Sequence, residues 1–154
     1  MPYRDSGSQD IGNPCHRRWR FKAVKPLSII VADDVPQIQA LVAQWLEPRG
    51  HKVVCASTGD ETLKLLKKEQ FDLVILDVLM PEGDGLDVIT ELQKRGRSER
   101  VLTISGGGKY MPAADCVKLA SGLGSHAALL KPFDERQLLD GIERALRTKD
   151  PAAA

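Results

Sequence analysis

The chain has 154 residues, a length that suits one domain and excludes two of ordinary size. Hydrophobic residues make up 42% and charged residues 28%, which allows a buried core and excludes a low-complexity chain. The formal net charge of +1 gives no overall field that would attract nucleic acid or an acidic membrane. Cys15, Cys55 and Cys116 lie far apart without a C-x-x-C pair, so neither a disulfide framework nor a zinc site is predicted, and a reducing, cytoplasmic setting is expected.

The two ends of the chain differ from its middle. Residues 1–26 hold six Lys or Arg and two Asp, and predict a disordered basic tail. Within it, residues 17–22 are basic and aromatic, which suits either a contact with lipid headgroups or nucleic acid or simply a solvated leader. Residues 149–154 form a short C-terminal tail, and residues 27–148 are predicted as one domain. No apolar run approaches the roughly 20 residues of a membrane helix, and no secretory signal is present, so no membrane span is expected.

From residue 27 onward, short apolar runs alternate with segments of helical period. Strands are predicted at residues 27–32, 51–56, 72–76, 101–104 and 127–130. Helices are predicted at residues 36–48, 58–69, 86–96, 113–121 and 134–147, with residues 83–85 as a turn. Five such units in succession require right-handed crossovers, so we expect an α/β fold with a doubly wound, five-stranded parallel sheet, flavodoxin-like (βα)5, in the strand order 2-1-3-4-5.

Polar side chains stand where four of these strands end. Asp33 and Asp34 follow the first strand, Asp77 the third, Ser105 the fourth and Lys131 the fifth. Taken singly, each has a plainer explanation as a helix cap or turn residue. Together they bring three mutually repelling carboxylates to one edge, which predicts a bound cation, most simply Mg²⁺, with Lys131 as a second positive charge. This set suits phosphoryl transfer, with Asp77 at the tip of the central strand as the nucleophile.

The same stretches resemble the receiver domain of two-component response regulators over about residues 27–148. The resemblance is carried by four motifs, in order and one strand–helix period apart: Val31-Ala32-Asp33-Asp34, Leu76-Asp77-Val78-Leu79-Met80-Pro81 with Gly83-Asp84-Gly85, Ile104-Ser105-Gly106, and Leu130-Lys131-Pro132-Phe133. The loop at residues 105–108 is similar to that of stand-alone, single-domain bacterial receivers. On this resemblance the family fold is the same five-stranded parallel sheet.

The resemblance also implies the metal site. Asp77 would be the phosphoacceptor and Asp34 a direct ligand of Mg²⁺, whereas Asp33 would bind the ion through water. The backbone carbonyl of Leu79 would complete the protein's share of the coordination.

Two further positions are implied to act on the phosphoryl group. The Ser105 hydroxyl would bond one of its oxygens, and Lys131 would bridge it to Asp77, with a cis peptide between Lys131 and Pro132. The family's switch aromatic, three residues before the lysine, is here Ala128, and Tyr110 is the candidate to replace it.

The function that the resemblance implies is a phosphorylation-activated signalling switch rather than an enzyme. The phosphoryl donor would be a histidine kinase or a histidine phosphotransfer protein. The few residues outside 27–148 leave no room for an output domain, so we expect no direct DNA binding. The signal is expected to leave by protein docking on the face of the fourth helix, fifth strand and last helix. Neither Leu79 nor Gly107 offers a polar group to orient water, so a slowly decaying acyl phosphate is expected.

Other interpretations stay open at this point. A pseudo-receiver, a binding module without phosphotransfer, would be expected to have lost the acids or the lysine. An aspartate-nucleophile phosphatase needs an acid where Leu79 stands, and a flavin site would be repelled by Asp33 and Asp34. The histidines, His16, His51 and His126, are interpreted as surface or loop residues without a role.

Overall fold

The computed structural model describes residues 26–78, 80, 85–96, 99–106, 118, 122 and 124–147, without the side chain of Leu86. Several predictions concern residues outside these ranges: the two tails, the Leu79 carbonyl, Gly107, Tyr110 and nearly all of the helix at 113–121.

The strands agree with the predicted ones to within one residue at each end. They are β1 (Ser28–Ala32), β2 (Lys52–Ala56), β3 (Leu73–Asp77), β4 (Arg100–Ser105) and β5 (Ala127–Leu130). The helices are α3 (Pro36–Leu46), α4 (Gly59–Lys68), α5 (Gly85–Lys94) and α7 (Glu135–Arg147). The first of them ends two residues early, because a 3₁₀ turn, η1 (Glu47–Arg49), takes in Pro48, which has no N–H to extend the α-helix. Gly85, predicted in a turn, is the first residue of α5.

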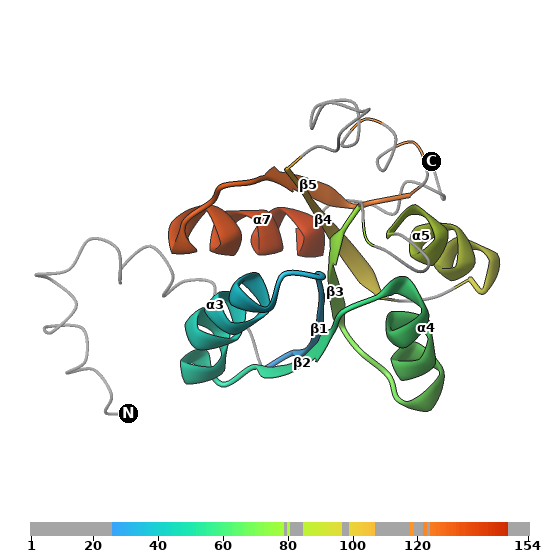
Figure 1. Ribbon diagram of the computed structural model, residues 1–154, viewed down its shortest axis with the longest axis horizontal. Coiled ribbons are helices and arrows are strands. Elements are labelled where there is room, and N and C mark those ends of the chain that lie inside the picture. The colour runs from blue at the N-terminus through green and yellow to red at the C-terminus, as the bar shows by residue number, and fades with distance from the viewer. Residues whose placement is uncertain are drawn as a thin grey trace, which may run out of the picture.

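The five strands are parallel and lie in the order β2-β1-β3-β4-β5, which confirms the predicted topology. Helices α3 and α7 cover one face of the sheet, and α4 and α5 cover the other (Figure 1). Alternate residues of β1 and β3 supply two cores, one on each face of the sheet. Every residue of β3 is buried, as expected for a central strand. Among the described helices, none is long and apolar enough to cross a membrane.

Side chains satisfy backbone groups at the start of α4 and at the end of α7. Thr58 caps α4 by accepting a hydrogen bond from the Glu61 N–H. At the other end of the fold, the Arg100 guanidinium donates to the carbonyls of Ala145 and Leu146, at 2.9 and 3.3 Å. This contact ties the last turn of α7 to the start of β4 and satisfies carbonyls that have no partner within the helix.

His51 and His126 lie in loops just before β2 and β5, as the sequence predicts, but neither is simply an exposed residue without a role. His126 is buried, and its Nδ1 accepts a hydrogen bond from the Val101 N–H at 3.0 Å. His51 is half-buried, and its Nδ1 accepts from the Leu27 N–H at 3.0 Å. Each imidazole therefore satisfies a backbone donor near the amino end of a strand, a role that depends on which strands are neighbours.

The contact of His51 predicts a loss of stability in mild acid. Burial lowers the pKa of His51, and the nearby Arg49 charge lowers it further. The unfolded chain then binds more protons than the folded one just below pH 6.5, so acidification costs stability. We expect the free energy of unfolding to fall as the pH drops below about 6.5, and to fall less steeply in His51→Asn, whose amide oxygen keeps an acceptor without titrating. Urea unfolding at several pH values measures both slopes, and equal slopes would contradict the prediction.

Candidate functional site

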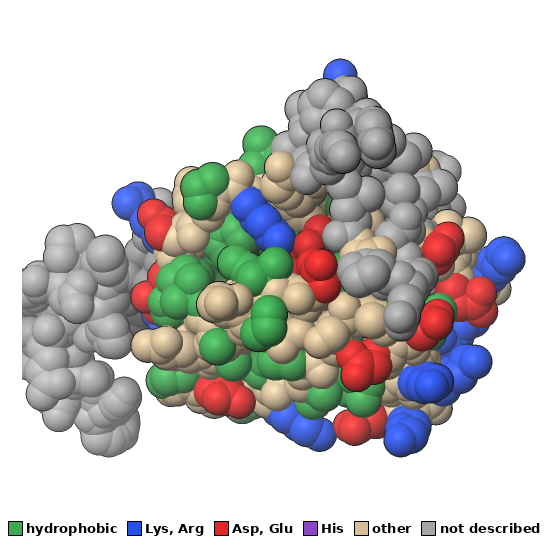
Figure 2. All heavy atoms as spheres, in the orientation of Figure 1, with side chains coloured by type: hydrophobic (Ala, Val, Ile, Leu, Met, Phe, Trp, Pro, Cys, Tyr) green, Lys and Arg blue, Asp and Glu red, His purple; other side chains and the backbone are tan. Residues whose placement is uncertain are grey.

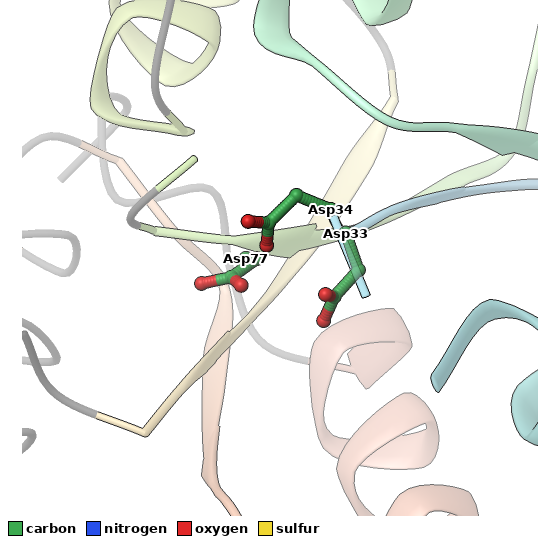
Figure 3. Close-up of side chains that lie close together, drawn as sticks. All are labelled: Asp33, Asp34 and Asp77. Atoms are coloured by element: carbon green, nitrogen blue, oxygen red, sulfur yellow. The ribbon is translucent and has the colours of Figure 1, made fainter. Parts of the chain in front are cut away.

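The carboxyl ends of β1 and β3 bring three aspartates together. One carboxylate oxygen from each of Asp33, Asp34 and Asp77 lies within 4.8 Å of the others. Figure 3 shows Asp33 and Asp34 following β1 and Asp77 at the end of the neighbouring β3. The predicted cluster is therefore present in the structure, because adjacent parallel strands end at the same edge of the sheet.

The three carboxylates differ in their surroundings. Asp33 is fully buried and Asp77 is 6% exposed, whereas Asp34 is exposed to solvent. One oxygen of Asp33 accepts a hydrogen bond from the Val35 N–H at 2.8 Å. In the space-filling view, acidic atoms reach the surface where β1 and β3 end, beside a basic side chain (Figure 2). The cluster is therefore shielded from solvent at Asp33 and accessible to solvent at Asp34.

Lys131 supplies the positive charge of the site from the end of β5. Its Nζ lies 2.9 Å from Oδ2 of Asp33 and 3.1 Å from Oδ2 of Asp77. Burial alone would lower the pKa of Lys131, but the contact with Asp33 and the charges of Asp77 and Asp33 outweigh burial and raise it. The peptide between Lys131 and Pro132 is cis, as the resemblance implies. Against three ionised carboxylates, one ammonium leaves two negative charges, which a divalent cation would balance.

Ser105 ends β4 at the same edge. Its side chain is buried, and its carbonyl accepts a hydrogen bond from the Lys131 N–H at 3.0 Å. The strand pairing places Ile104 opposite Asp77, so Ser105 comes one residue beyond the partner of the proposed nucleophile. The next residue, Gly106, lies against Lys131, because an added Cβ would be 3.4 Å from the lysine Cδ. The structure therefore brings the predicted aspartates, Ser105 and Lys131 to one edge of the sheet.

Two residues beside the site were given no part in it by the sequence analysis, which did not mention Gln39 and took Gly85 only as part of a turn and a motif. Gln39 of α3 donates to the backbone carbonyls of Asp33 and Ala56, at 2.7 and 3.0 Å. Gly85 donates its N–H to the Val78 carbonyl at 2.9 Å and lies directly against the backbone of Asp77. A glutamine near the start of a helix carries no distinctive signal, and a glycine beside Gly83 and Asp84 is typical of a turn.

Ala128 stands where the resemblance places the switch aromatic, and the structure shows its surroundings. Ala128 lies on β5, where it pairs in register with Thr103, and it is partly exposed. Its carbonyl accepts from the Arg144 guanidinium of α7, at 3.4 Å. The other residues of that interpretation, Tyr110 and Gly107, and the Leu79 carbonyl lie outside the described residues.

Comparisons with curated proteins agree with this geometry. The transcriptional regulatory protein GlrR of Escherichia coli (strain K12) is 34% identical over 128 residues, covering 83% of this chain and 28% of GlrR. PhoP of Bacillus subtilis (strain 168), the alkaline phosphatase synthesis transcriptional regulatory protein, is 31% identical over 125 residues, covering 81% of this chain and 50% of PhoP. The chain therefore spans between about a quarter and a half of the length of these relatives.

Solved structures show the same fold. The receiver domain of NtrX from Brucella abortus has a TM-score of 0.69 and 32% identity, and the match covers 79% of this chain and 99% of that one. A CheY-like receiver domain protein from Methanospirillum hungatei JF-1 has a TM-score of 0.70 at 24% identity, covering 79% of this chain and 94% of that one. The family described as "Response regulator receiver domain" matches residues 29–143. On this match, the chain belongs to the family of response regulator receiver domains.

Proposed function

We propose that this receiver domain accepts a phosphoryl group on Asp77, with Mg²⁺, from a histidine kinase or a histidine phosphotransfer protein. The observation that carries the proposal is the site itself: three carboxylates within 4.8 Å, with the Lys131 ammonium 3.1 Å from Asp77. Acids held this close are costly unless cations balance them, and the lysine balances only part of their charge.

The donor set suits Mg²⁺, which prefers oxygen ligands and keeps several waters. Asp34 and Asp77 would bind the ion directly, with the Leu79 carbonyl as a further ligand. Asp33 would act through water, since its oxygens already contact the Val35 N–H and the Lys131 ammonium. Bound there, Mg²⁺ would neutralise charge on the phosphoryl oxygens.

In the proposed reaction, a carboxylate oxygen of Asp77 attacks phosphorus and forms an acyl phosphate. The bond from phosphorus to the donor's imidazole nitrogen breaks, and the electron pair leaves with that nitrogen. The Lys131 ammonium, which contacts the Asp77 carboxylate, would then contact the phosphoryl oxygens that carry the negative charge. The Ser105 hydroxyl would donate a hydrogen bond to one of these oxygens. Ser105 ends β4, which pairs with β3, and the Lys131 ammonium lies 3.1 Å from Asp77, so little rearrangement is needed.

The signal is proposed to leave by protein docking, without DNA binding by this domain. The proposed face consists of the fourth helix, near residues 113–121, together with β5 and α7. Leu130, the last residue of β5, would offer a partner one exposed apolar side chain, at 49% exposure.

Phosphorylation by acetyl phosphate tests the function without the unknown kinase. We expect Mg²⁺-dependent incorporation of one phosphoryl group, stable in neither acid nor base and mapped to Asp77 by mass spectrometry. Asp77→Asn is nearly isosteric and lacks the nucleophilic oxygen, so it is expected to fold and to incorporate none. No incorporation in the wild-type protein would favour a phosphorylation-independent binding module. Undiminished incorporation in Asp77→Asn would refute the assignment of the phosphoacceptor.

A further inference from the structure

The backbone at Asp33 leaves the sheet immediately beside the acidic cluster. The last bond between β1 and β2 in this region runs from the Asp33 N–H to the Ala56 carbonyl, at 3.0 Å. Beyond it the chain turns toward α3, so the Asp33 carbonyl cannot continue the strand pairing. A buried carbonyl at such a point needs another donor.

Gln39, in the first turns of α3, is that donor. Its Nε2 lies 2.7 Å from the Asp33 carbonyl, 3.0 Å from the Ala56 carbonyl and 3.2 Å from the Ser57 hydroxyl. The two hydrogens of the amide nitrogen match the two carbonyls. The opposite orientation would place the amide oxygen against both carbonyl oxygens, so the surroundings determine which way the amide points.

The Asp33 carbonyl belongs to the peptide group that joins Asp33 to Asp34. Because a peptide group is planar, holding its oxygen also fixes the plane and the Cα of Asp34. The Asp34 side chain is exposed, so its direction depends on that backbone. We propose that Gln39 is a positioning residue of the Mg²⁺ site, which holds the Asp33–Asp34 peptide so that both carboxylates stay near Asp77. This inference rests on the proposed function.

There are two physical reasons why the hold of Gln39 on the Asp33–Asp34 peptide should affect Mg²⁺ binding. The carboxylates of Asp33, Asp34 and Asp77 repel one another before a cation binds, and that repulsion pushes a loosely held Asp34 outward. Mg²⁺ also demands near-octahedral geometry, so a displaced ligand weakens binding. Gln39 supplies two donors without a positive charge, and a positive charge there would oppose the metal.

The test is a calorimetric titration with Mg²⁺ alone, on the full chain. Gln39→Met removes the amide but keeps the length of the side chain. We expect its dissociation constant for Mg²⁺ to rise about three- to tenfold, the range expected for losing a hydrogen bond. At a Mg²⁺ concentration below saturation, the rate of phosphorylation by acetyl phosphate should fall with the occupancy of the site. Gln37→Met is the matched control, an exposed glutamine on the same helix, and should leave both quantities unchanged.

The outcomes separate this inference from the proposed function. A Gln39→Met protein that unfolds more easily in urea yet binds Mg²⁺ as tightly as the wild type would overturn the positioning role and leave the proposed function standing. Wild-type protein that binds Mg²⁺ but is not phosphorylated would instead count against the proposed function, and the titration would still decide on Gln39. If Gln39→Met fails to fold, Gln39→Asn, which is one methylene too short to reach both carbonyls, is expected to give the same rise.

Discussion

Replacing Gly85 with alanine is expected to destabilise the domain by roughly 3 kcal/mol, the upper end of the usual cost of overpacking that forces backbone to shift. An added Cβ would lie 2.2 Å from the carbonyl oxygen of Asp77 and 2.9 Å from the Cα of Val78. Both obstacles are backbone atoms of the strand end that carries the proposed phosphoacceptor. The clash can therefore be relieved only by moving α5 or the end of β3.

The displacement should reach the site as well as the fold. In the protein that remains folded, we expect Gly85→Ala to bind Mg²⁺ more weakly, because Asp77 shifts relative to Asp33 and Asp34. Gly122→Ala is the control: Gly122 is helical and exposed, and an added Cβ meets nothing within 4 Å. Its stability should stay unchanged or rise by up to about 1 kcal/mol, as alanine favours helix. Equal free energies of unfolding for the two variants in urea would contradict the prediction.

Most of the fold could be predicted because the signals for a parallel sheet are local. The residues of β3 form a continuous apolar run, and this strand is buried along its whole length. The repeated succession of strand and helix then determines the topology through the handedness of the crossovers. One error is local: α3 ends at Leu46 because Pro48 has no N–H to extend it. The other depends on a contact between elements, since α5 begins at Gly85, whose N–H donates to the Val78 carbonyl just after β3.

The same distinction applies to the site. Asp33, Asp77 and Lys131 could be predicted because each stands at or just after the end of a strand, and parallel strands end at one edge of the sheet. The part played by Gln39 could not be predicted, since it depends on where α3 crosses the ends of β1 and β2. His126 shows the same limit: its imidazole is buried because β5 lies beside β4, which places its ring at the Val101 N–H.

Lys131→Met is expected to lower the free energy of unfolding by about 3 kcal/mol at neutral pH without Mg²⁺, the cost of removing one partner from a buried ion pair. Asp33 and Asp77 would then lose the ammonium that both contact. Lys52→Met provides a matched control, because Lys52 lies at the same 3.1 Å from Glu69 that separates Lys131 from Asp77, but with its side chain 60% exposed. An exposed pair of this kind should contribute less than about 1 kcal/mol.

The same substitution should affect the two functions of the site in opposite directions. Without the ammonium, the acidic cluster is more negative, so Lys131→Met is expected to bind Mg²⁺ more tightly than the wild type. Phosphorylation by acetyl phosphate should nevertheless slow, since the Lys131 ammonium no longer stabilises the negative charge on the phosphoryl oxygens. Calorimetric titration and the rate of phosphoryl incorporation measure the two effects separately. Weaker Mg²⁺ binding in Lys131→Met would contradict the expectation that a more negative cluster binds the ion more tightly.

The pH dependence of the difference in unfolding free energy between wild type and Lys131→Met tests whether the charged form of Lys131 is what stabilises the fold. Burial would lower the pKa of Lys131, but the contact with Asp33 and the charges of Asp77 and Asp33 raise it above the usual 10.5. For a base whose pKa is raised on folding, the stabilisation is complete below the unfolded pKa and is lost as the pH rises through the folded one. The difference between wild type and Lys131→Met should therefore be constant around neutral pH and shrink only above about pH 10.5. A difference that already disappears between pH 7 and pH 9 would mean that the ammonium is not what stabilises the folded site.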